Sequence, residues 1–129
     1  MILRPMTIHD GNKLLEWKNY PETRQFAIVA KEIISAEDHY EWLKDNMRYF
    51  KIIEHQSNPI GAIRLQDEEV SIWIDQRHRN HHIASLFLEN MEKGTKAKIV
   101  SGNIASMRAF INAGFKPVSF QDNYYIFQK

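Results

Sequence analysis

The chain has 129 residues, of which 43% are hydrophobic and 26% are charged, which is typical of one globular domain with a single core. Its formal net charge of +1 excludes the strongly basic body that dominates nonspecific nucleic-acid binding. The absence of cysteine excludes disulfides, thiolate metal ligands and a cysteine nucleophile. The first ten residues lack the apolar core of a signal peptide, and no later apolar run is long enough to span a bilayer. We therefore expect a soluble, cytoplasmic protein without nucleic-acid or membrane partners.

The N-terminal part of the chain predicts an edge strand followed by two helices. Residues 2–4 form a short apolar run that stops at Pro5, and proline is confined to the edges and ends of sheets. Thr7 or Asp10 is expected to cap the first helix, and Ser35 the second.

The middle of the chain predicts an antiparallel meander. Three β-rich runs over 48–55, 60–65 and 70–75 are separated by the four-residue turns Q-S-N-P and Q-D-E-E.

The C-terminal part predicts alternating helices and strands. The expected elements are a helix from Ile83 to Gly94, a strand over 97–102, a helix from Asn103 to Gly114 and a terminal hairpin. No repeat or linker interrupts the chain, so we expect one mixed α/β (α+β) domain over residues 1–129.

The junction between the third run of the meander and the following helix is unusually polar. It reads D-Q-R-H-R-N-H-H-I-A-S over residues 75–85. A helix start presents unpaired backbone N–H groups, and Arg77 and Arg79 add charges that suit phosphate oxygens. The junction is therefore either an anion site or a solvated turn.

Three histidines, His78, His81 and His82, stand in the same junction. We expect their side chains to face solvent, with phosphate contact as the second interpretation. A metal site is the third, because no carboxylate completes a known ligand spacing.

Residues 75–84 resemble the pyrophosphate-binding loop of the GNAT superfamily of acetyl-CoA-dependent N-acetyltransferases, which has the form Arg/Gln-x-x-Gly-x-Gly/Ala. Asn80 and His82 stand where glycines are common. Residues 103–115 resemble the late helix of that family, Asn-x-x-Ala/Ser followed by an aromatic residue and Gly-Phe. The order of elements agrees over essentially the whole chain. The resemblance implies a mostly antiparallel central sheet flanked by helices and splayed between its fourth and fifth strands.

The resemblance also implies acetyl-CoA as co-substrate and no metal. The residues that it places against the cofactor lie on the fourth strand, on the loop and helix that follow, and on the late helix. They are Ile72, Trp73, Ile74, Arg79, Asn80, His81, His82, Ile83, Ala84, Ser85, Asn103, Ser106 and Phe110.

Acetyl transfer from a thioester needs a neutral amine, a polarised carbonyl and a proton donor for the departing thiolate. Phe110 stands where many relatives have a tyrosine donor, so the donor is expected to be Tyr124, Tyr125 or Ser106. Because the two tyrosines alternate along one strand, only one of them would face the cleft.

The candidate bases are carboxylates around the last strand of the meander. Glu69 is the one we select, with Glu68, Asp75 or a chain of water molecules as alternatives. Solvated turn charges remain the competing interpretation of each carboxylate.

The first two helices resemble the branches of the family that acetylate nucleotide-linked amino sugars and ribosomal proteins. Asn19, Arg24 and His39 are expected to contact a polar acceptor, whereas Trp17 and Trp42 are expected to pack in the core. So short a chain leaves little material to cover a large substrate, which favours a homodimer in which a partner subunit completes the site.

Two functions from different classes follow. The first is an N-acetyltransferase acting on a small primary amine, with a nucleotide-linked amino sugar as the preferred acceptor. The second is a non-catalytic binding or regulatory module with the GNAT fold and weak or no affinity for CoA.

Overall fold

The computed structural model describes residues 1–28, 31–79 and 82–129, and its strands form one seven-stranded sheet in the order β1-β2-β3-β4-β5-β7-β6. The strands are β1 (Ile2–Pro5), β2 (Phe50–His55), β3 (Asn58–Gln66), β4 (Glu69–Ile74), β5 (Lys96–Val100), β6 (Lys116–Gln121) and β7 (Tyr124–Gln128). Every neighbouring pair is antiparallel except β4 and β5, which are parallel. The predicted mixed, mostly antiparallel fold is therefore confirmed.

Helices cover both faces of the sheet. They are α1 (Gly11–Asn19), α2 (Pro21–Gln25), α3 (Ala36–Asn46), α4 (Ile83–Leu88) and α5 (Ile104–Asn112), with the 3-10 turns η1 (Ile8–Asp10), η2 (Met47–Tyr49) and η3 (Gln76–His78). Thr7 is the N-cap of η1, where it forms a capping box with Asp10, and Asp10 is also the N-cap residue of α1, although its side chain makes no capping hydrogen bond to that helix. None of the helices in the described ranges reaches the length and apolarity that a bilayer crossing requires.

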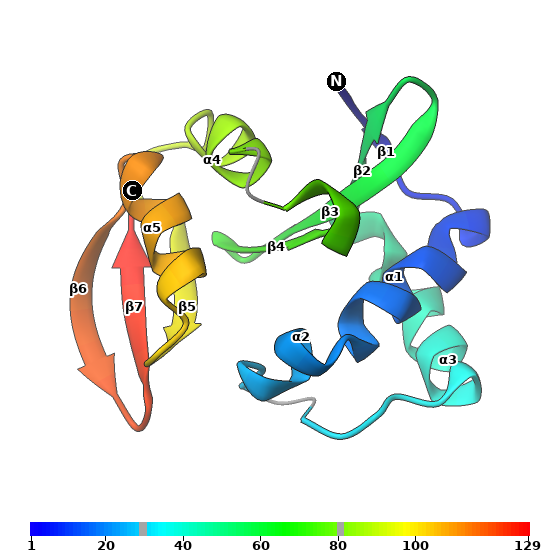
Figure 1. The fold of residues 1–129 in the computed structure, drawn as a ribbon, viewed down its shortest axis with the longest axis horizontal. Helices are drawn as coiled ribbons and strands as arrows, with labels where there is room; N and C mark the ends of the chain where they lie inside the picture. The colour runs from blue at the N-terminus through cyan, green and yellow to red at the C-terminus, as the bar shows by residue number, and fades with distance from the viewer. Residues whose placement is uncertain (29–30, 80–81) are drawn as a thin grey trace.

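The sheet splays between β4 and β5, as predicted. The two strands share a single ladder pair, Glu69 with Lys96, next to which the Lys96 N–H donates to the Glu68 carbonyl at 2.8 Å. Beyond that pair they diverge, and Figure 1 shows β1 to β4 with α1 and α3 on one side and β5 to β7 with α5 on the other. The sheet is thus divided into two parts joined at one end.

The turns of the meander are shorter than predicted. Gln56 and Ser57 have φ of 51° and 65°, and Asp67 and Glu68 have φ of 52° and 67°. Positive φ at both central residues is the signature of a two-residue hairpin turn whose twist matches that of the flanking strands. The prediction of four-residue turns was wrong because Asn58 and Pro59 of the first turn, and Gln66 and Glu69 of the second, already pair in the ladder.

The helix predicted from Ile83 to Gly94 is also shorter, since α4 ends at Leu88. Met91 packs against the core from the turn that follows, so its helical spacing does not come from a helix. Gly94, with φ of 94°, lies in the turn before β5. The helix predicted from Asn103 to Gly114 agrees better with the structure, in which α5 spans Ile104–Asn112. At its start, Asn103 Oδ1 accepts from the Ser106 N–H at 3.4 Å.

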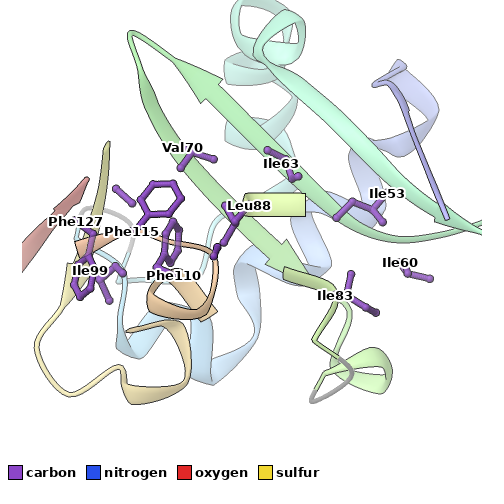
Figure 2. Close-up of a cluster of buried hydrophobic side chains, with 12 residues drawn as sticks. Ile53, Ile60, Ile63, Val70, Ile83, Leu88, Ile99, Phe110, Phe115 and Phe127 are labelled. Carbon is purple, nitrogen blue, oxygen red and sulfur yellow. The ribbon is translucent and has the colours of Figure 1, made fainter. Parts of the chain in front are cut away.

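Two hydrophobic clusters occupy opposite faces of the sheet. Successive residues of a strand point to opposite faces, and Ile52 and Ile53 accordingly belong to different clusters, as do Ala62 and Ile63. The α1-side cluster comprises Met6, Leu14, Trp17, Leu43, Phe50, Ile52 and Ala62. Figure 2 shows the α5-side cluster, in which Phe110, Phe115, Phe127 and Ile99 gather at one end and Ile60 and Ile83 at the other.

A buried carboxylate fastens the end of β4 to α1. Asp75 is 1% exposed and accepts from the Trp17 indole Nε1 at 3.1 Å and from the Arg77 backbone N–H at 3.0 Å. The Arg77 side chain adds donors at 3.1 and 3.2 Å. Hydrogen bonds from Arg77 outweigh the effect of burial and hold the pKa of Asp75 well below its usual range. The carboxylate is therefore ionised near neutral pH and fixes where the loop begins.

We expect Asp75→Asn to lower the free energy of unfolding by roughly 2 kcal/mol at pH 7, because buried charge-assisted hydrogen bonds are lost. A carboxyl whose folded pKa is depressed contributes stability above its unfolded pKa, and that stability disappears as the pH falls through the folded pKa. The difference between variant and parent should therefore shrink below about pH 4. Urea unfolding at pH 7 and pH 3 measures this, with Asp45→Asn on the exposed surface of α3 as the control. Equal losses at both pH values would contradict the assignment.

Candidate functional site

The edge of β4 that faces β5 is open beyond the single ladder pair. The Asp75 N–H donates to the Ile60 carbonyl at 2.8 Å, which makes these two residues a hydrogen-bonded pair between β4 and β3. Because hydrogen-bonding direction alternates along an antiparallel strand, the backbone groups of Ile72 and Ile74 point away from β3. β4 therefore presents a strand edge on which an extended ligand with amide groups could pair.

The side chains of the same stretch divide between the two faces. Ile72 and Ile74 pack against the α5-side cluster, and Trp73 packs against the α1-side cluster. Ile72, Trp73 and Ile74, which are predicted to contact the cofactor, thus form one wall of the splayed region.

The guanidinium of Arg79 is turned toward α2. Its Nη1 lies 3.5 Å from Glu22 Oε1, and its Cζ lies 5.4 Å from the centre of the Tyr20 ring. Its Nε donates to the Ile74 carbonyl at 3.4 Å, on the open edge of β4. Arg79 therefore stands between the open edge and the α1–α2 segment. Asn80 and His81, which follow it, lie outside the described residues.

The start of α4 offers backbone groups more than side chains. His82 is exposed and has φ of 57°, the left-handed conformation that glycine would favour at this position. Ile83 is buried in the α5-side cluster, Ala84 packs against the same cluster, and Ser85 Oγ donates to the Ala109 carbonyl at 3.1 Å. The first N–H groups of a helix have no partner within it, so residues 83–85 present donors to a ligand through the backbone.

The predicted residues of α5 separate into two roles. Asn103 caps the helix, and Ser106 is half-buried in its first turn. Phe110 is 3% exposed and packs edge-on against Phe115 with ring centres 4.9 Å apart, so its side chain is part of the core. A Cβ at Gly102 would lie 3.9 Å from Phe26, which follows α2. The segment after α2 thus reaches the turn between β5 and α5.

The two candidate tyrosines face opposite sides of the sheet. Tyr125 pairs with Ile99 and packs against the α5-side cluster. Tyr124 pairs with Val100 on the other face, where the Lys98 ammonium lies 5.8 Å from its ring centre. Its hydroxyl accepts from Gln121 Nε2 at 2.7 Å. Tyr124 is therefore the tyrosine directed to the α1 side of the sheet.

Of the three candidate carboxylates, Glu69 and Asp75 are engaged with cations. Glu69 Oε1 lies 3.4 Å from Lys98 Nζ, at the end where β4 and β5 still pair. Asp75, with its lowered pKa and its hydrogen bonds to Trp17 and Arg77, is a weak proton acceptor.

The three residues predicted to bind the acceptor hold the first helices together. The side-chain amide of Asn19 donates from Nδ2 to the Ile34 carbonyl at 2.9 Å, and its Oδ1 accepts from the Ile34 N–H at 2.8 Å. His39 is 1% exposed, and its Nε2 lies 2.9 Å from the Gly11 carbonyl. Burial lowers the pKa of His39, which favours the neutral ring. Arg24 Nε donates to the Asn19 carbonyl at 3.2 Å. Their polar atoms are used largely within the chain.

Lys18, which the sequence interpretation did not select, lies on the face of the sheet that carries the α1-side cluster. The Lys18 ammonium is 3.5 Å from the centre of the Trp42 ring, and Phe50 and Trp73 lie at 5.7 and 5.6 Å. We call these three rings the aromatic box. Burial, and secondly the charge of Arg64, lowers the pKa of Lys18 to about 8. No local spacing reveals the box, because its rings come from three different elements.

Two pockets open beside η3, with volumes of about 470 and 320 Å³. Both are lined by His55, Ile60 and His78, and the smaller one also touches Ile83. They lie on the β3 side of β4, away from its open edge. Within the described ranges, no three His, Asp or Glu side chains gather in a way that would hold a metal ion.

The family model described as Acetyltransferase (GNAT) domain matches residues 1–116. An uncharacterized protein of Methanocaldococcus jannaschii is 27% identical over 135 residues, a match that covers 90% of this chain but only 28% of the length of that relative. The chain therefore spans less than a third of the curated relative that it matches.

Solved structures agree over nearly the whole chain. A ribosomal-protein-alanine N-acetyltransferase from Brucella melitensis superposes with a TM-score of 0.79 and 19% identity, covering 100% of this chain and 99% of the other. A putative acetyltransferase from Salmonella typhimurium, solved with its cofactor acetyl-CoA, gives a TM-score of 0.75 and 16% identity, covering 99% and 91%. Because the family model spans most of the sequence and the splayed sheet agrees with it, the chain belongs to the GNAT acetyltransferase family.

Proposed function

We propose that residues 1–129 form one N-acetyltransferase domain, which transfers an acetyl group from acetyl-CoA to a primary amine of a small molecule. A nucleotide-linked amino sugar is the acceptor we favour. The observation that carries this proposal is the open edge of β4 at Ile72, which lies between a diverging β5 and the loop that leads to α4.

The residues around that edge have complementary roles in the proposed reaction. The Ile72 backbone groups would pair with the amides of the pantetheine arm, as a neighbouring strand would. The N–H groups of residues 83–85 would hold the diphosphate, with Arg79 supplying charge. A thioester is already activated, so correct placement of the amine supplies much of the rate.

Titration calorimetry with acetyl-CoA, followed by free-thiol release with a panel of amines, tests the proposal. We expect saturable heat at submillimolar cofactor and thiol release that depends on the amine. Absence of saturable heat at millimolar acetyl-CoA would favour the alternative, a GNAT-fold binding module without catalysis.

We expect Arg79→Ala to raise the KM for acetyl-CoA about tenfold, with a smaller effect on kcat, because a charged contact to the ground-state diphosphate is lost. Glu22→Gln should lower the KM, since Glu22 competes for the same guanidinium at 3.5 Å. Arg48→Ala, on the exposed surface of η2, is the matched control. An unchanged KM in Arg79→Ala would separate the loop from cofactor binding.

We expect Tyr124→Phe to lower kcat by about 100-fold if its hydroxyl protonates the departing thiolate, with little change in KM. Tyr125→Phe is the matched control, because Tyr125 packs against the α5-side cluster. Steady-state rates over a range of pH measure the effect. Should Tyr124→Phe retain full turnover, the donor would be Ser106 or water.

A further inference from the structure

Two cations share the face of the sheet that carries the aromatic box. Lys18 is half-buried on α1, and its ammonium lies against Trp42. Arg64 of β3 stands opposite Phe50 of β2 and Ser71 of β4, on the same face. After burial, the charge of Arg64 is the second cause of the lowered pKa of Lys18.

Neither cation has a carboxylate partner among the described residues. The Arg64 side chain donates to the Gln66 amide oxygen, while its Nε is buried and meets no hydrogen-bond acceptor in the described part of the chain. Glu69, on the same face of β4, is 3.4 Å from Lys98. His39, from α3, also faces Lys18, whose charge contributes to the lowered pKa of His39.

Placing like charges together in a partly dehydrated site raises the energy of the unliganded protein. Such an arrangement is expected where a ligand supplies the missing negative charge. The rings of the aromatic box add flat apolar surface beside the two cations.

We propose that Lys18 and Arg64 form an oxyanion-binding subsite, and that the acceptor carries a phosphate or carboxylate group in addition to its amine. The assignment of this ligand as the acceptor rests on the proposed function, whereas binding of the oxyanion does not. Trp73 connects this subsite to the proposed cofactor edge of β4, because it lines the aromatic box and directly follows Ile72.

Calorimetry without acetyl-CoA compares three amino sugars that differ in one group: glucosamine, glucosamine 6-phosphate and muramic acid. We expect at least one anionic sugar to bind about tenfold more tightly than glucosamine, and the preferred sugar identifies the oxyanion. Equal binding of all three sugars, or no saturable binding of any, would overturn the proposal.

Variants locate the subsite. Lys18→Met and Arg64→Met should each remove most of the preference for the anionic sugar, while Lys18→Arg should keep it because the charge remains. Lys13→Met, which removes a lysine lining the larger pocket beside η3, and Arg48→Ala, on the exposed surface of η2, are the controls. If a control loses the preference and Lys18→Met does not, the anion binds elsewhere. Thermal melts confirm that each variant is folded.

Proton uptake gives a second readout. Lys18 has a pKa of about 8 in the unliganded protein, and an adjacent anion raises it. Binding at about pH 8.5 should therefore take up a fraction of a proton, measured as a dependence of the binding heat on the ionisation enthalpy of the buffer. Lys18→Met should abolish this dependence, and its persistence there would assign the proton to another group.

The two proposals fail separately. Oxyanion binding without amine-dependent thiol release would remove the transferase and leave the subsite. Amine-dependent thiol release with equal binding of all three sugars would remove the subsite and leave the transferase.

Discussion

The buried carboxylate of Asp75 is the interaction on which the rest of the site depends. It lies where β4 ends, and it joins the indole of Trp17 on α1 to the first residues of the loop. An ionised group in this position is stable only with several donors around it. The loop therefore leaves β4 in a fixed direction, toward the helices of the α1 side, and the position of Arg79 beside Tyr20 and Glu22 follows from that direction.

The splay of the sheet is consistent with the same constraint. The end of β4 is held to α1, whereas α4 is held to α5 by the hydrogen bond from Ser85 to the Ala109 carbonyl. β4 and β5 both contribute side chains to the α5-side cluster, but among the described residues they share only the ladder pair Glu69–Lys96. Figure 1 shows the consequence, since α5 lies with β5 to β7 while α1 and α3 lie with β1 to β4.

The sequence predicted those features that depend on neighbouring residues. Alternating apolar residues located the meander, and the Asn103 cap and Gly114 located α5. The length of α4 was wrong because Met91 reaches the core without helical backbone. The proposed oxyanion subsite could not be found in this way. Lys18 and Arg64 are 46 positions apart in the sequence, and only the fold shows that neither has a carboxylate partner among the described residues.

The geometry of β4 links the two halves of the proposed reaction. Ile72 contributes its backbone edge to one side of the strand, and Trp73 contributes its ring to the aromatic box. Consecutive residues are about 3.8 Å apart between Cα atoms, so a strand fixes this separation more tightly than two loops would. A cofactor paired along Ile72 and an acceptor held beside Trp73 would then meet at a distance set by the sheet itself. Placement of this kind is the main contribution a protein can make when the acyl group is already activated.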